Sequence, residues 1–147
     1  LFSSLLVFLA AFDLRWKELP LEIMGGASVL FILFSLFTKQ FDLFSFLIAV
    51  AVALIVFGGQ SLISHGRWLG GGDLWMGIMI ASALGWPAIG FVVYLTYLLG
   101  GMSYALLLMF GFVKRDARVA FAPWLAVGSL GTVWFGKWME AFMRGIL

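Results

Sequence analysis

The sequence contains no cysteine, a single histidine and few charged side chains. Without cysteine there is no disulfide, no thiolate nucleophile and no cysteine-based zinc site. A metal site built from several histidines is also excluded, and Ser/His/Asp catalysis would depend on His65 alone. We therefore expect no metal ion and no cofactor, and we seek the reactive groups among the acidic residues.

The shortage of charge indicates the surroundings of the protein. A soluble domain carries about 25% charged residues, whereas this chain of 147 residues carries 11% and is 64% hydrophobic. The net charge of +2 is too small to suggest nucleic acid as a partner. The sequence therefore predicts a protein surrounded by membrane lipid.

The apolar runs are continuous and do not alternate, which favours membrane helices over the strands of a barrel. No repeat or linker divides the chain, so we expect a single domain over residues 1–147. The predicted fold is all-α, a polytopic transmembrane bundle of about six membrane helices with the first one truncated. The predicted helices are 1–12, ending at Asp13, then 23–37, 43–63, 73–84, 88–113 and 119–135, with an amphipathic tail over 137–147.

The basic residues predict the orientation of this bundle. Alternating loops place six of them on one side and three on the other, and the positive-inside rule makes the first side cytoplasmic. Asp13 follows the first helix and Asp73 begins the fourth, so both acids are expected at the cytoplasmic face. The six are Arg15, Lys17, Arg67, Lys114, Arg115 and Arg118, and the three are Lys39, Lys137 and Arg144.

Two acids at one membrane face suggest a shared chemistry. A carboxylate at membrane depth costs several kcal/mol, so it is a functional candidate by default. Two close carboxylates share a proton: the ionised one can activate water, and the protonated one can donate to a carbonyl oxygen. The pair predicts peptide hydrolysis without a metal. Alternatively, Asp13 is an ordinary interfacial charge beside Arg15 and Lys17, and Asp73 is a helix N-cap.

The glycines Gly70, Gly71 and Gly72 precede Asp73. They can form a flexible loop, or they can let the backbone approach a substrate strand closely at a sharp transition from loop to helix. A phosphate-binding loop is disfavoured because no Lys-Ser/Thr follows. Other glycines are expected to allow close helix packing, namely Gly25 with Gly26, Gly100 with Gly101, and Gly128 with Gly131.

Three segments together resemble the catalytic domain of the type IV prepilin peptidases, membrane aspartyl proteases of the Gly-x-Gly-Asp kind. The first is Asp13-Leu14-Arg15-Trp16-Lys17-Glu18-Leu19-Pro20, an acid, a basic residue and an aliphatic-Pro pair after a helix. The second is Gly70-Gly71-Gly72-Asp73 opening a helix, and the third is Phe121-Ala122-Pro123-Trp124-Leu125-Ala126-Val127-Gly128. They occur in the family's order and span nearly the whole chain.

The resemblance implies that Asp13 and Asp73 are the catalytic aspartates, and that Gly70, Gly71, Gly72, Pro20 and Pro123 shape the site or bind substrate. It further implies cleavage of the basic leader of type IV prepilins or pseudopilins, for pili or type II secretion. The enzyme would lie in the bacterial inner membrane with its site facing the cytoplasm. The family's cysteine-containing region, which is linked to N-methylation, is not present in this chain.

The sequence departs from the family pattern at three positions: Trp75 stands where Lys is common, Leu21 where Asn or Asp is common, and Ala122 where Gly is common. Other interpretations therefore stay open. One is a different Gly-x-Gly-Asp membrane protease, such as a preflagellin peptidase or a presenilin-like enzyme. The others are a small ion or proton transporter subunit, with acids near mid-membrane, and a non-catalytic component of a secretion system.

Overall fold

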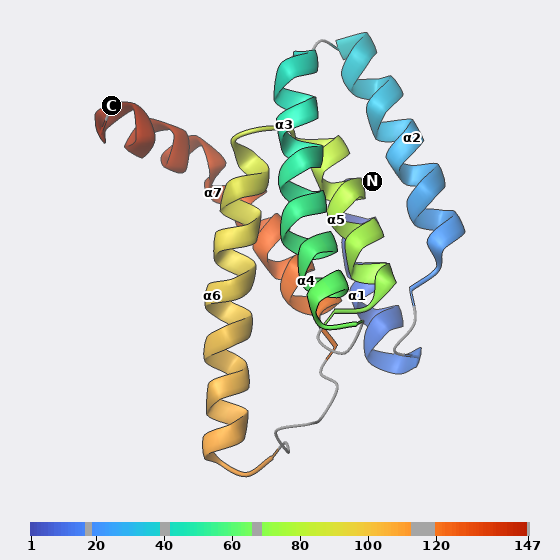
Figure 1. Ribbon diagram of the computed structural model, residues 1–147. Helices are drawn as coiled ribbons and strands as arrows, with labels where there is room; N and C mark the ends of the chain where they lie inside the picture. The colour runs from blue at the N-terminus through green and yellow to red at the C-terminus, as the bar shows by residue number, and fades with distance from the viewer. Residues whose placement is uncertain (17–18, 39–41, 66–68, 113–119, 147) are drawn as a thin grey trace.

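The structure is a computed structural model, and it describes residues 1–16, 19–38, 42–65, 69–112 and 120–146. Nearly all of these residues lie in helices, with no strand among them (Figure 1). The prediction of an all-α fold is therefore confirmed. In chain order the elements are α1 (Phe2–Trp16), α2 (Leu21–Thr38), α3 (Leu43–Ala53), the π-helix η1 (Leu54–Gly58), α4 (Gly59–Ile63), α5 (Gly71–Leu84), α6 (Ala88–Met109) and α7 (Ala122–Ile146).

Within the described residues, two helices are long and apolar enough to cross a membrane. One is the continuous rod Leu43–Ile63, made of α3, η1 and α4, and the other is α6. Large apolar side chains remain exposed on the rod; Ile55, for example, is 72% exposed. This agrees with a membrane protein. The apolar stretch Leu21–Ser35 and helix α5 are shorter, so a bundle of about six spans stays a prediction.

The predicted orientation also stays a prediction, because most of the basic residues on which it depends lie outside the described residues. Those are Lys17, Lys39, Arg67, Lys114, Arg115 and Arg118.

The first and fourth predicted helices begin or end at the wrong residues. Helix α1 does not end at Asp13 but continues to Trp16, where the Arg15 guanidinium lies 4.9 Å from the Trp16 ring. Helix α5 begins at Gly71 with Gly70 as its N-cap, so Asp73 is the third residue of the helix and not its cap. Both aspartates therefore belong to helical turns.

The ends of the last two predicted helices also need correction. Helix α6 stops at Met109 because Gly111 adopts a φ of 71°. The Gly111 N–H donates to Leu108 O and the Phe112 N–H to Leu107 O, the pairing of a Schellman C-cap. Helix α7 runs without a break to Ile146, so the tail is part of it. The predicted boundary residues Val113 and Val119 lie outside the described residues.

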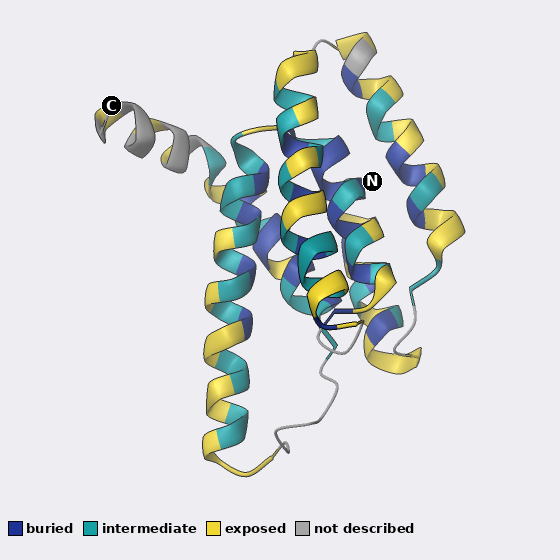
Figure 2. Cartoon of the chain, viewed as in Figure 1, coloured by how far each residue is buried: buried dark blue, intermediate teal, exposed yellow. Residues whose placement is uncertain are grey.

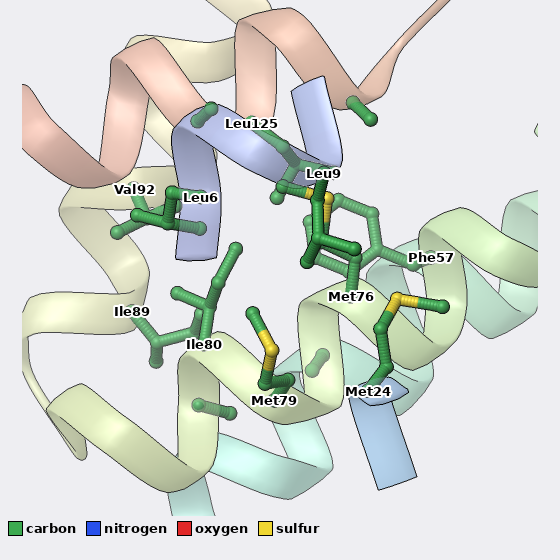
Figure 3. Packing of buried hydrophobic residues seen from close by; sticks show 14 of the residues in the cluster. Leu6, Leu9, Met24, Phe57, Met76, Met79, Ile80, Ile89, Val92 and Leu125 are labelled. Carbon is green, nitrogen blue, oxygen red and sulfur yellow. The ribbon is translucent and has the colours of Figure 1, made fainter. Parts of the chain in front are cut away.

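Helix α5 lies at the centre of the bundle, where it packs against α2, α3 and η1. Figure 2 shows that much of α5 is buried, whereas α2 and α6 have many exposed positions. Figure 3 shows Met76, Met79 and Ile80 of α5 in one buried cluster with side chains of other helices. The fully buried core side chains include Leu6 and Leu9 of α1, Phe57 of η1, Met76, Met79 and Ile80 of α5, and Leu125 of α7.

Some glycines allow the close helix packing that the sequence predicts, and others do not. A Cβ at Gly128 would collide with Thr96 of α6. One at Gly100 would lie 3.3 Å from the Trp124 side chain. The prediction is wrong for Gly25, Gly26 and Gly101, where nothing lies within 4 Å of an added Cβ. The tightest approach that the sequence did not indicate is at Gly77, where a Cβ would overlap the Phe57 ring.

Gly77→Ala should lower stability by about 1–3 kcal/mol, because the new methyl group displaces a buried ring that fills the core. The matched control is Gly101→Ala in α6, where a Cβ meets nothing within 4 Å and alanine favours the helix. The thermal unfolding midpoint in detergent measures both. An unfolding midpoint for Gly77→Ala equal to that of Gly101→Ala would contradict the contact.

Candidate active site

Three segments that are far apart in the sequence meet at one end of the bundle: the C-terminal end of α1, the start of α5 and the start of α7 (Figure 1). Two of them carry the aspartates singled out from the sequence. Asp13 is 7% exposed and Asp73 is 8% exposed. Buried carboxylates need specific partners, because loss of water disfavours the charged form.

Asp73 receives its partner from the start of its own helix. The Gly70 N–H donates to Asp73 Oδ2 at 3.0 Å, so the third residue of α5 caps the residue before the helix. The first turn of a helix carries partial positive charge, which stabilises a carboxylate there. The local sequence therefore holds the Asp73 side chain in one orientation at the helix start.

Asp13 receives a partner from a different helix. The Ala122 N–H, at the first residue of α7, donates to Asp13 Oδ2 at 3.3 Å. Helices α1 and α7 pack against each other over this region. Asp13 therefore stands at the N-terminus of α7 much as Asp73 stands at the N-terminus of α5, and both carboxylates benefit from unpaired N–H groups of a helix end.

The two carboxyl groups interact electrostatically, since the charge of Asp13 acts on Asp73. The geometry argues against both simpler interpretations of these acids. Asp13 is not an exposed interfacial charge, because it is buried. Asp73 is not an N-cap, because Gly70 has that position. Among the described residues, no group of three or more His, Cys, Asp and Glu could hold a metal ion.

Of the three glycines before Asp73, Gly72 has the strictest steric requirement. A Cβ at Gly72 would lie 2.8 Å from the Cβ of Leu19, whereas one at Gly71 meets nothing within 4 Å. Gly70 has an extended backbone, with φ −74° and ψ 158°, that any residue can adopt. Gly72 thus brings the segment after α1 against the start of α5, close to both aspartates.

The two prolines that the resemblance assigns to the site lie at the starts of helices. The carbonyl oxygen of Pro20 accepts the Met24 N–H at 3.2 Å, directly before α2. Pro123 is the second residue of α7, where its missing N–H would have no intrahelical acceptor. Pro20 follows Leu19 and Pro123 follows Ala122, so each borders a residue that contacts the site.

The positions that depart from the family pattern differ in their surroundings. Trp75 is 43% exposed, and Leu21 is exposed at the start of α2. Ala122 is fully buried, and it contributes its backbone N–H to Asp13. Because a backbone group makes this contact, the exchange of glycine for alanine leaves it in place.

An aromatic trio, formed by Phe57, Tyr97 and Phe121, lies beside the site. The Phe57 and Tyr97 rings stack at 6.5 Å, and the Tyr97 and Phe121 rings lie 5.6 Å apart. Sequence reasoning missed Phe57 and Tyr97, because nothing in an apolar helix distinguishes one aromatic residue from another. The available signal was Phe121, which opens the third segment of the resemblance.

The model of the type IV leader peptidase family matches residues 1–106. That match covers most of the chain and both aspartates, so the protein belongs to this family of peptidases. The third segment, with Ala122, lies beyond the match, and its place at the site rests on its hydrogen bond to Asp13.

The chain is also similar to the prepilin leader peptidase/N-methyltransferase of Escherichia coli (strain K12). The two are 28% identical over 85 residues, which cover 58% of this chain and 37% of the relative. The chain therefore spans little more than a third of the curated relative that it matches. No solved structure matches.

The approach of Leu19 to Gly72 can be tested with cysteines, since the chain has none of its own. The variant Leu19→Cys/Gly72→Cys should form a disulfide under mild oxidation, because Cβ atoms 2.8 Å apart need to move by only about 1 Å to reach disulfide geometry. Protection from a maleimide–polyethylene glycol label reports it. Leu19→Cys/Gly71→Cys is the control, and equal labelling of both pairs would contradict the contact.

Proposed function

We propose that this chain forms the catalytic part of a prepilin-type leader peptidase and that Asp13 and Asp73 activate the water that cleaves the substrate. The observation that carries the proposal is the pair of buried carboxylates, each at a helix N-terminus, that interact at one end of the bundle. Membership of the family supports the reaction class.

The two carboxyl groups supply the reaction without another group. The ionised carboxylate takes a proton from water, and the water oxygen bonds to the scissile carbonyl carbon. The electron pair of the carbonyl π bond moves to its oxygen, which takes the proton of the second carboxyl group. In the collapse, the C–N bond breaks and the nitrogen takes the proton held by the first carboxyl. One hydroxyl of the intermediate returns a proton to the second carboxylate.

The site suits a substrate with a basic leader and an apolar helix. Asp13 lies in the last turn of α1 and Asp73 in the first turn of α5, so both acids are at helix ends. An apolar substrate helix would remain in lipid while its leader reaches these acids, at the cytoplasmic face of the bacterial inner membrane. A proton or ion relay would instead place its acids along the middle of membrane helices.

Asp13→Asn and Asp73→Asn should each abolish cleavage of a prepilin that carries its leader, because an amide can neither take a proton from water nor share one. The loss should reach at least about 10³-fold, since residues that act as a unit fail together. The assay compares the full-length variants in liposomes by the mobility of the pilin product.

Asp42→Asn is the matched control for these variants. Asp42 is an exposed cap at the start of α3 that accepts the Ser45 N–H at 2.9 Å, so its replacement should leave cleavage intact. Wild-type cleavage rates in both Asp13→Asn and Asp73→Asn would exclude the two-aspartate mechanism.

Ala122→Pro removes the N–H that Asp13 accepts, at a helix position that tolerates proline. A hydrogen bond to a charged group is worth about 1.5–3 kcal/mol, so kcat should fall by about ten- to a hundredfold. Ala122→Gly retains the N–H and should retain most of the activity. Equal kcat values for the two variants would show that this donor does not support Asp13.

A further inference from the structure

A groove with a volume of about 360 Å³ lies between α1 and α2, and the mechanism above does not use it. The residues that line it include Leu1, Leu5, Glu22, Gly26, Leu30 and Phe31. All of its lining residues except Glu22 are apolar. Several of them, such as Gly26 and Leu30, are exposed, so the groove is open to the surroundings of the protein. Its volume falls within the range of about 300–1,000 Å³ that is usual for binding sites.

The groove exists because two consecutive helices pack on different neighbours. Helix α1 packs mainly on α7, and α2 packs mainly on α5; Figure 1 shows α2 at the edge of the bundle. The two helices meet where the rings of Phe2 and Phe31 lie edge to face, with centroids 5.5 Å apart. Phe2 begins α1, whereas Asp13 lies in its last turn. The aromatic pair therefore bridges the two helices at the end of the groove that is far from Asp13.

The α1 wall of the groove continues as an apolar face toward Asp13. After Leu5, the residues at intervals of three or four are Phe8, Phe12 and Trp16, and this spacing places them on the same face of the helix. The rings of Phe8 and Phe12 lie 5.8 Å apart, and those of Phe12 and Trp16 lie 4.4 Å apart. Phe12 directly precedes Asp13. An apolar helix that lies along this face therefore reaches the turn that holds the aspartate.

The α2 wall of the groove carries its charge at the end near the aspartates. Glu22 is the second residue of α2 and is exposed. Three residues before it, Leu19 contacts Gly72, the neighbour of Asp73. One turn after Glu22, an added Cβ at Gly26 would meet nothing within 4 Å. This wall thus combines a carboxylate near the catalytic end with a glycine that allows the close approach of another helix.

The electrostatics of this end favour a basic ligand. Asp13 and Asp73 are buried, so Glu22 is the acid that the groove presents to a bound molecule. The guanidinium of Arg15, a cation in the last turn of α1, lies over the Trp16 ring. An acyl chain of a phospholipid would fit the apolar walls, but its phosphate would be repelled by the Glu22 carboxylate. A ligand with a cation next to an apolar segment satisfies both parts of the groove.

We propose that the groove between α1 and α2 binds the apolar helix of the substrate and that Glu22 pairs with a basic residue of its leader. This proposal rests on the proposed function, which supplies a substrate with these two parts. Their order along the substrate matches the groove. The apolar helix lies against the apolar walls, the leader lies at the Glu22 end, and the peptide bond between them falls beside the two aspartates.

Gly26→Leu in the full-length protein tests the docking of the helix, because the new side chain fills the groove. With a prepilin substrate in liposomes, KM should rise about tenfold, the effect of losing the burial of one large apolar side chain, while kcat changes little. The matched control is Gly101→Leu in α6, where an added Cβ also meets nothing within 4 Å outside the groove. Its KM should equal that of the wild type, and equal KM values for the two variants would overturn the proposal.

Glu22→Lys tests the contact with the leader. KM for the prepilin should rise about fivefold, the effect of losing an exposed ion pair. A prepilin in which Glu replaces the basic leader residue should show the opposite preference, with a lower KM for Glu22→Lys than for the wild type. Asp42→Lys reverses the charge of an exposed acid at the start of α3 and should change neither KM. If Glu22→Lys does not reverse the preference between the two leaders, Glu22 does not bind the leader and the proposal fails.

Other occupants of the groove and failure of the proposed function give different results. If a phospholipid or a second copy of the chain fills the groove, Gly26→Leu would change the thermal unfolding midpoint or the oligomeric state but not KM. With cleavage by the wild type and its loss in Asp73→Asn, that result would overturn the docking of the substrate helix alone. Wild-type rates of cleavage in Asp73→Asn, or no cleavage by the wild type, would overturn the proposed function, and the docking proposal with it.

Discussion

The arrangement of the site depends on the hydrogen bond from the Ala122 N–H to the Asp13 carboxylate. It joins the last turn of α1 to the first residue of α7 and so brings the two ends of the sequence together. A buried carboxylate and the N–H groups of a helix start both need hydrogen-bond partners. Their pairing satisfies both, and it positions Phe121 for its contact with Tyr97.

At the start of α5, the Asp73 carboxylate receives its hydrogen bond from a residue nearby in the sequence. Gly70 donates to Asp73, and Gly72 lets Leu19 approach to a distance that no larger residue would allow. Because Leu19 follows α1 and Gly72 is the second residue of α5, this contact brings the chain after Asp13 next to the turn that holds Asp73. The interaction between the two acids therefore arises from steric fit as well as from charge.

The helical class and the position of both aspartates in one place could be predicted from the sequence, because apolar runs and rare acids are strong signals in a membrane protein. The helix boundaries could not. Helix α1 continues past Asp13 to Trp16, and Asp13 contacts α7, a pairing of distant segments that the local sequence does not indicate. The contacts of Tyr97 were also not predictable, since Phe57 and Phe121, which surround it, lie far from it in sequence.

The π-helix η1 affects which side chains of the following helix face the neighbouring helices. A π-turn contains one residue more than an α-turn, so the helix beyond it is rotated by about 100° relative to an uninterrupted α-helix. Phe57 lies within this turn, and Gln60 is the second residue after it. Relatives that lack the additional residue would present another side chain to α5 and Tyr97. In an alignment, the length of this segment would therefore distinguish the relatives that share the aromatic trio from those that do not.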